Sequence, residues 1–105
     1  MSPIAITPEP PYYAVIFTSL KNPNDQGYSE MADRMVELVQ KQEGFLGFES
    51  ARETVGITIS YWRDLASIQR WKADLEHREA QQKGKELWYR AYTIRIAKVE
   101  REYSL

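Results

Sequence analysis

The sequence of 105 residues contains no cysteine and a single histidine, His77. A chain without cysteine forms no disulfide, no thiolate zinc site and no iron–sulfur cluster, and it has no cysteine nucleophile. One histidine also excludes a metal site built from several histidines, although a site that includes carboxylates is not excluded by composition. We therefore expect no metal site.

Charge of one sign and long apolar runs are also lacking. The 14 Lys and Arg residues offset 15 Asp and Glu residues, which leaves a formal net charge of −1. Nucleic-acid-binding proteins usually carry a basic patch, which the near-balance of charges here does not favour. A segment that crosses a bilayer needs roughly 20 apolar residues, whereas the longest uncharged apolar run here covers residues 12–20. The N-terminus has neither the basic start nor the apolar core of a signal peptide. We expect a soluble, cytoplasmic protein that binds neither nucleic acid nor membrane.

The prolines mark the beginning of the chain. Four of the five prolines fall within residues 1–11, and proline fixes φ and lacks a backbone donor, so this segment is expected to be an extended leader. A chain of this length forms one domain. We therefore divide the sequence into the leader, residues 1–11, and a single domain, residues 12–105.

The period of the apolar residues predicts the elements of this domain. Apolar runs typical of strands cover residues 12–20, 45–52, 56–62 and 87–99, and helical periods cover residues 28–42 and the segment after Asp64, which is a good N-cap. In the last strand the alternation places Tyr89 on one face with Ala91 and Thr93, and Trp88, Tyr92, Ile94 and Ile96 on the other. The order βαββαβ predicts an α+β, ferredoxin-like fold with two helices on one face of a four-stranded antiparallel sheet.

Two of the predicted strands are apolar on both faces. Residues 12–20 and 87–99 show this pattern, but helices on one side of a sheet cover one face alone. A second copy of the chain is the simplest cover for the other face, because closed homodimers dominate soluble oligomers. We expect a homodimer in which two sheets form a shared, barrel-like core.

The sequence is rich in aromatic residues, with three Trp, seven Tyr and three Phe. Such residues between helices and a sheet are typical of a pocket for a small apolar or aromatic ligand. The same side chains could equally fill the core of a small domain. The expected lining residues are Phe17, Tyr61, Trp62, Arg63, Trp71, Trp88 and Tyr92.

Trp71 and His77 are the candidate catalytic residues. Trp71 belongs to an apolar stripe that directs it toward the sheet, formed by Leu65, Ile68, Trp71 and Leu75. In one unbroken helix, His77 lies about 120° around the axis from Trp71 and faces water. A helix break after Leu75, with a short third helix over residues 76–83, would turn His77 inward; otherwise His77 has no role.

Several short motifs occur together in a characteristic order. They are Gly44–Ser50 (GFLGFES), Ile59–Asp64 (ISYWRD), and then Trp71, His77, Ala80, Gly84 and Trp88–Tyr89. In this order and spacing, over about residues 12–103, the sequence resembles the antibiotic biosynthesis monooxygenase family. The resemblance implies a dimeric α+β barrel of ferredoxin-like subunits.

The resemblance also implies two kinds of activity. Some members of the family oxidise polycyclic aromatic substrates without metal or flavin, and others degrade haem. The haem-degrading branch has an Asn on the first strand, a Trp on the second helix and a His ten residues beyond it. Trp71 matches the Trp, but the tenth residue after it is Gln81 and residues 12–20 contain no Asn.

Three functions are therefore open. The favoured hypothesis is a cofactor-independent monooxygenase that acts on a small aromatic or quinone-like substrate, which itself reduces oxygen. The main alternative is a non-catalytic dimeric protein that binds a small apolar ligand. Haem binding or haem degradation is a weaker alternative, since two of its three marker residues are absent.

Overall fold

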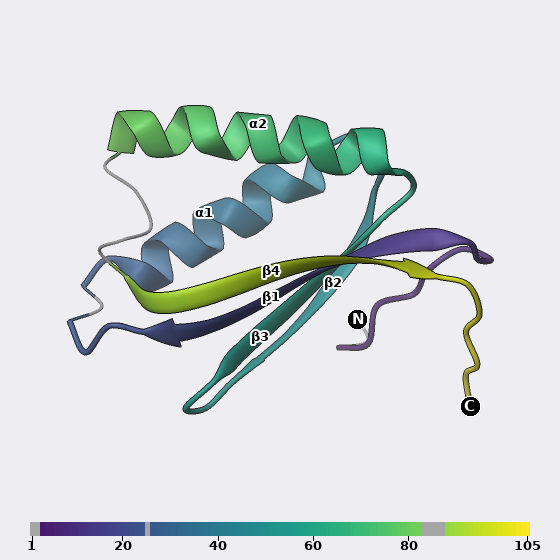
Figure 1. The fold of residues 1–105 in the computed structure, drawn as a ribbon, viewed down its shortest axis with the longest axis horizontal. Coiled ribbons are helices and arrows are strands. Elements are labelled where there is room, and N and C mark those ends of the chain that lie inside the picture. The colour runs from purple at the N-terminus through teal and green to yellow at the C-terminus, as the bar shows by residue number, and fades with distance from the viewer. Residues whose placement is uncertain (1–2, 25, 83–87) are drawn as a thin grey trace.

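The computed structural model describes residues 3–24, 26–82 and 88–105, and for residues 77–82 it describes the backbone alone. The described residues confirm the predicted order of elements and the α+β, ferredoxin-like fold (Figure 1). The elements are β1 (Tyr12–Lys21), α1 (Tyr28–Gln40), β2 (Phe45–Arg52), β3 (Gly56–Trp62), α2 (Leu65–Gln82) and β4 (Tyr89–Val99).

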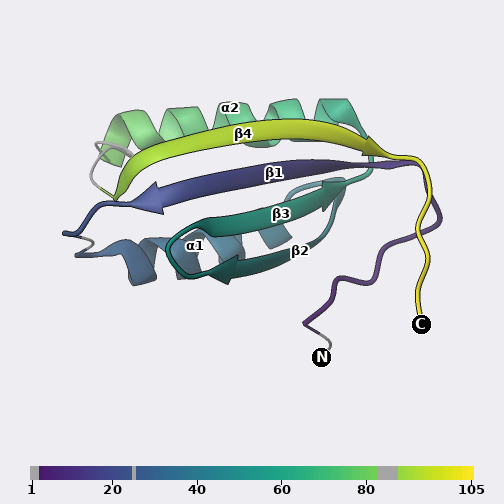
Figure 2. The ribbon, with the colours of Figure 1, turned by 60° about the horizontal axis from the view of Figure 1, so that its bottom comes forward.

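The four strands form one antiparallel sheet in the order β2-β3-β1-β4. Both helices lie against one face of this sheet, which we call the helix face, and the opposite face is the open face (Figures 1 and 2). The two ends of the chain leave the same end of the sheet and run on the side of the open face (Figure 2).

The fully buried side chain of Trp62 defines the helix face. Trp62 is 0% exposed and packs with Val39 of α1 and Ile68 of α2 in the main core cluster. Its ring lies edge-on to Phe45 at 5.5 Å between centroids and 6.3 Å from the ring of Trp71. Since opposite residues of an antiparallel pair share a face, the register of Trp62 with Tyr13 extends the helix face to Val15, Phe17 and Ser19 on β1.

The open face is partly covered by the chain itself. Tyr12 and Ala14 are each 5% exposed, and the Tyr12 hydroxyl donates to the Glu102 carboxylate at 2.5 Å. Glu102 also accepts from the Thr7 hydroxyl at 2.7 Å, and the Ala5 amide donates to the Glu49 carboxylate at 3.0 Å. The leader and the C-terminal segment therefore cover one end of the open face, whereas Ile57 of β3, near the other end, is 43% exposed.

Of the two alternatives for the second helix, the break after Leu75 is wrong and the unbroken helix is confirmed. Helix α2 runs without interruption from Leu65 to Gln82, so residues 76–82 continue it instead of forming a third helix; Lys83 lies outside the described residues. Asp64 caps this helix as expected, because its carboxylate accepts from the Ser67 amide at 2.8 Å. Hydrogen bonds from the Ser67 hydroxyl and from the Ser67 amide hold the pKa of Asp64 below its usual value.

The alternation predicted for the start of β4 is also wrong. The register shifts between Leu20 and Lys21, so that Leu20 pairs with Ala91 but Lys21 pairs with Tyr89. Arg90 is the extra residue of this bulge, and such an insertion changes which face the preceding residues occupy. Tyr89 consequently lies on the helix face beside Tyr92, with 6.1 Å between the ring centroids.

Gly44 and Gly27 provide a matched pair for measuring the packing at the start of α2. Both have φ of +85°, but a Cβ on Gly44 would overlap the buried Ser67 side chain, whereas a Cβ on Gly27 has its nearest neighbour, Trp88 Nε1, at 3.8 Å. We expect Gly27→Ala to cost about 1 kcal/mol from backbone strain, and Gly44→Ala at least about 2 kcal/mol because overlap adds to the strain. Urea unfolding measures both, and equal losses would contradict this account.

Candidate functional site

Four aromatic side chains gather on the helix face, away from Trp62. The Phe17 ring lies 5.2 Å from Tyr89 and 5.4 Å from Tyr92, and the Tyr28 ring lies 5.7 Å from Tyr89, measured between centroids. We call Phe17, Tyr28, Tyr89 and Tyr92 the aromatic cluster. It lies at the end of the sheet where β1 ends and where α1 and β4 begin (left in Figure 1).

The backbone around Trp88 fixes the position of the aromatic cluster. The Asn22 amide donates to the Trp88 carbonyl at 2.8 Å, and the Trp88 indole donates to the Gln26 carbonyl at 2.9 Å. These bonds join the start of β4 to the loop before α1. Because the bulge follows at once, Tyr89 is directed at Phe17 and Tyr28 instead of at the open face.

Two cations border the aromatic cluster. Lys21 Nζ lies 4.2 Å from the centroid of the Tyr28 ring, and the guanidinium carbon of Arg52 lies 5.8 Å from the same centroid. Cations at these distances are attracted by the negative face of an aromatic ring. The cluster therefore combines apolar ring surface with positive charge, which suits a planar ligand that carries negative charge.

The phenol of Tyr89 stays protonated at neutral pH. Burial raises its pKa above the ordinary value, and the hydrogen bond from its hydroxyl to the Tyr28 hydroxyl, at 3.4 Å, raises it further. The positive charge of Arg52 acts in the opposite direction. Tyr89 is thus available as a hydroxyl that donates and accepts hydrogen bonds, not as a phenolate.

The seven expected lining residues do not gather at one place. Phe17 and Tyr92 belong to the aromatic cluster, whereas Trp62 and Trp71 pack in the core near the start of α2. Trp88 holds the loop before α1 through its indole.

Tyr61 and Arg63 lie apart from both groups. Tyr61 lies on the open face, because successive strand residues alternate and Trp62 is on the helix face. Its hydroxyl donates to Glu49 at 2.6 Å, and burial together with this bond raises the pKa of Tyr61 to about 12. Arg63 is exposed and pairs with Glu43 and Asp64, each at 3.3 Å.

The two candidate catalytic residues both belong to α2. Trp71 is half-buried and packs against the core cluster, so it can contribute to the core and to an accessible surface together. His77 lies on the same helix, but its side chain is outside the described residues. Catalytic roles for Trp71 and His77 stay predictions.

Three residues of this site were not expected from the sequence. Tyr28 counts in the sequence as part of the buried stripe of the first helix, and the bulge in β4 conceals the face of Tyr89. Arg52 lies at the end of a strand, where a charged residue does not by itself indicate a binding site. The sequence feature that points to this cluster is the high content of tyrosine, seven in 105 residues.

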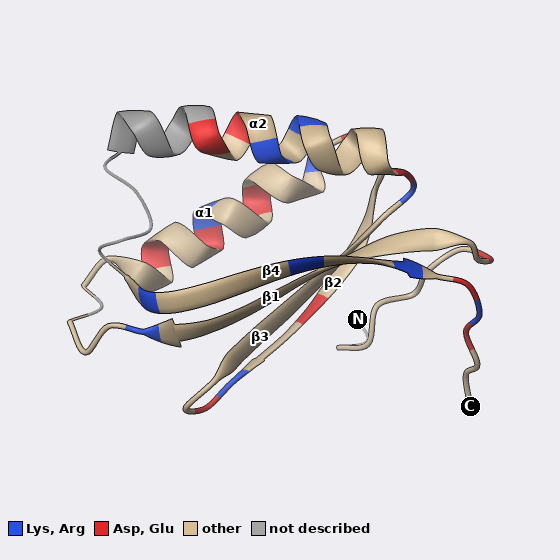
Figure 3. Ribbon diagram, in the orientation of Figure 1, with Lys and Arg blue, Asp and Glu red and all other residues tan. Residues whose placement is uncertain are grey.

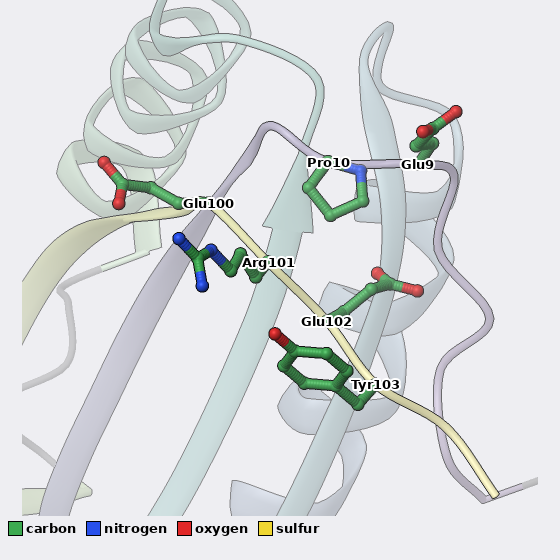
Figure 4. A pocket seen from close by; sticks show the side chains of 6 residues that line it. All are labelled: Glu9, Pro10, Glu100, Arg101, Glu102 and Tyr103. Carbon is green, nitrogen blue, oxygen red and sulfur yellow. The ribbon is translucent and has the colours of Figure 1, made fainter.

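A hollow of about 470 Å³ lies at the other end of β4, between the leader and the C-terminal segment (Figure 4). It is wide open, and its lining residues are Glu9, Pro10, Glu100, Arg101, Glu102 and Tyr103. Three carboxylates and one guanidinium make it a charged surface, which does not suit an apolar aromatic ligand.

Charged residues of both signs are interspersed along α1 and α2 (Figure 3). In the part of the chain that the structure describes, no three His, Asp or Glu side chains come together as a metal site would require. Among the same residues, neither helix has the length and apolar character needed to cross a bilayer. A cytoplasmic location stays a prediction.

The ferredoxin-like sheet with two helices on one face defines a small α+β domain. The sequence profile of the antibiotic biosynthesis monooxygenase family matches residues 11–83. The chain belongs to this family, which confirms the resemblance found in the motifs.

Known proteins similar to this chain include one curated relative. It is the uncharacterized protein YqjZ of Bacillus subtilis (strain 168), 54% identical over 98 residues, which cover 91% of this chain and 86% of that protein. Solved structures share the fold at low identity. Rv0793 from Mycobacterium tuberculosis has a TM-score of 0.71 and 13% identity, with 89% of this chain and 99% of that chain covered. SnoaB, a cofactor-independent oxygenase from Streptomyces nogalater, has a TM-score of 0.63 and 14% identity, with 91% and 98% covered.

Replacement of Trp71 separates a core role from a surface role. We expect Trp71→Phe to fold, and Trp71→Ala to lose less than about 2 kcal/mol of unfolding free energy, because part of the indole faces out of the core. Trp62→Ala is the control and should cost about 3–5 kcal/mol, since Trp62 is 0% exposed. Chemical denaturation compares the variants, and a Trp71→Ala loss equal to that of Trp62→Ala would show that Trp71 is purely a core residue.

Proposed function

We propose that this protein is a cofactor-independent oxygenase that acts on a small aromatic or quinone-like substrate. The observation that carries the proposal is the aromatic cluster on the helix face, which offers ring surface bordered by two cations. Membership in the antibiotic biosynthesis monooxygenase family supports it. The structural similarity to SnoaB, named a cofactor-independent oxygenase, adds support at the level of the fold.

The proposed reaction requires no external reductant. A phenolic substrate loses its proton, and the resulting anion transfers electrons directly to oxygen. One oxygen atom forms a bond to a ring carbon, which loses its hydrogen, and the other leaves as water, so that phenol and O₂ give quinone and H₂O. The substrate supplies all four electrons. The protein contributes ring surfaces that exclude water and positive charge that favours the anion.

The second candidate is a non-catalytic protein that binds a small aromatic ligand. The described surroundings of the aromatic cluster favour it, because the charged side chains found against its rings are Lys21 and Arg52, cations instead of the His or carboxylate that usually acts as a general base. Haem degradation has less support, since β1 contains no Asn and Gln81 stands where the pattern has a His.

Oxygen uptake with an anthrone or a naphthol distinguishes an oxygenase from a binder. We expect one O₂ consumed for each quinone formed, faster than in the absence of protein. Tyr92→Ala should lower kcat/KM about ten-fold through the loss of one aromatic contact. Tyr103→Ala, at an 86% exposed tyrosine outside the cluster, is the control and should have no effect. Uptake no faster than without protein would leave the binding function alone.

We propose further that the protein is a homodimer in which a second copy covers the open face. Ile57 of β3 lies on the open face and is 43% exposed, and a small domain gains stability when such a residue is buried. Light scattering at roughly 10 µM should give twice the mass of one chain. Ile57→Asp should dissociate and unfold the protein together, whereas Val55→Asp, in the turn between β2 and β3, should do neither. A single-chain mass for the unmodified protein would overturn the proposal.

A further inference from the structure

Arg52 lies across the sheet instead of pointing into solvent. Arg52 on β2 is paired with Gly56 on β3, Gly56 with Ser19 on β1, and Ser19 with Tyr92 on β4, so these four residues form one row on the helix face. The guanidinium lies over Gly56, where any Cβ would overlap it, and it donates a hydrogen bond to the Ser19 hydroxyl. The guanidinium can therefore occupy this position because residue 56 is glycine and has no side chain.

The charge of Arg52 is not neutralised by the residues that the structure describes. Arg52 is half-buried, and within those residues its hydrogen-bond partner is the Ser19 hydroxyl and no carboxylate forms an ion pair with it. A guanidinium has five N–H donors in a planar fork. A half-buried cation whose donors are not used by a carboxylate can bind an anionic ligand. Part of the free-energy cost of removing water from the guanidinium has already been incurred on folding.

The guanidinium faces the aromatic cluster. Its carbon lies 5.8 Å from the centroid of Tyr28, and its charge acts on the pKa of Tyr89 against the effect of burial. The row that contains Arg52 ends at Tyr92, which contacts Phe17 and Tyr89. A ring packed against the cluster would thus place a substituent near the guanidinium fork.

We propose that Arg52 binds the anionic oxygen of an aromatic ligand, a phenolate or carboxylate, whose ring packs against the aromatic cluster. The proposal rests on the ligand site given above, but not on turnover. It places this contact on Arg52 and not on Arg63, the arginine among the expected lining residues, since Arg63 is exposed and already paired with Glu43 and Asp64. The ligand class that follows is a planar aromatic anion, preferred to a neutral molecule of the same shape.

Equilibrium binding of naphthoate and naphthamide, matched in shape but not in charge, tests this assignment. By isothermal titration calorimetry, we expect the unmodified protein to bind naphthoate at least about ten-fold more tightly than naphthamide. The reason is that a hydrogen bond between the guanidinium and a carboxylate is stronger than one to a neutral amide. Arg52→Gln should remove this preference by weakening naphthoate about ten-fold while changing naphthamide less than about two-fold. Arg63→Gln is the matched control and should leave both affinities unchanged.

Gly56→Ala provides a second variant that keeps the charge and displaces the guanidinium. Because the φ of Gly56 is not positive, alanine is accepted by the backbone, and the added methyl group should weaken naphthoate in the same direction as Arg52→Gln. If Arg52→Gln does not fold, the preference of the unmodified protein and the Gly56→Ala result decide the question.

Three results would overturn the assignment: no preference for naphthoate, an undiminished preference in Arg52→Gln or Gly56→Ala, or no binding of either probe at millimolar concentration. Failure of the oxygenase proposal would be a separate outcome, because oxygen uptake measures turnover whereas calorimetry measures binding. A protein that prefers naphthoate through Arg52 but consumes no oxygen would be an anion-selective binder.

Discussion

The burial of Trp62 between the sheet and both helices is the constraint on which the rest of the structure depends. It is 0% exposed and contacts Val39 and Ile68, so it can occupy only the helix face. Because side chains of a strand alternate with period two, this one placement decides the face of every residue in register with it. Phe17 and Ser19 are therefore directed toward the helices, and the row from Arg52 to Tyr92 is formed on the same side.

Two local departures from regular strand structure then create the candidate site. The bulge at Arg90 turns Tyr89 onto the helix face, so that three strand residues and Tyr28 of α1 bring their rings together. Gly56 leaves room for a guanidinium to lie flat across β3. A bulge that directs a side chain into a site is a recurring device near functional regions of sheets. Neither departure disturbs the core, which lies farther along the sheet around Trp62.

The order of elements could be predicted because each depends on local periodicity, and the cap at Asp64 could be predicted because it depends on adjacent residues. The candidate site depends on contacts between distant segments, which local periodicity does not reveal. The aromatic content of the sequence favours one pocket that contains both Tyr61 and Trp62, although consecutive strand residues occupy opposite faces. The position of Arg52 depends on cross-strand register with Gly56 and Ser19, which no property of residues 45–52 alone reveals.

The two arginines show why the surroundings of a charge matter more than its place in a motif. Arg63 stands in a conspicuous segment, but water and two carboxylates surround it, and an exposed pair of this kind contributes little energy. Arg52 is half-buried beside aromatic rings, where a lower effective dielectric strengthens its interaction with an anion. Since the core around Trp62 stabilises the fold and the proposed anion contact lies in the row at the far end of the sheet, a change at Arg52 or Gly56 can alter a ligand preference while the core is left as it is.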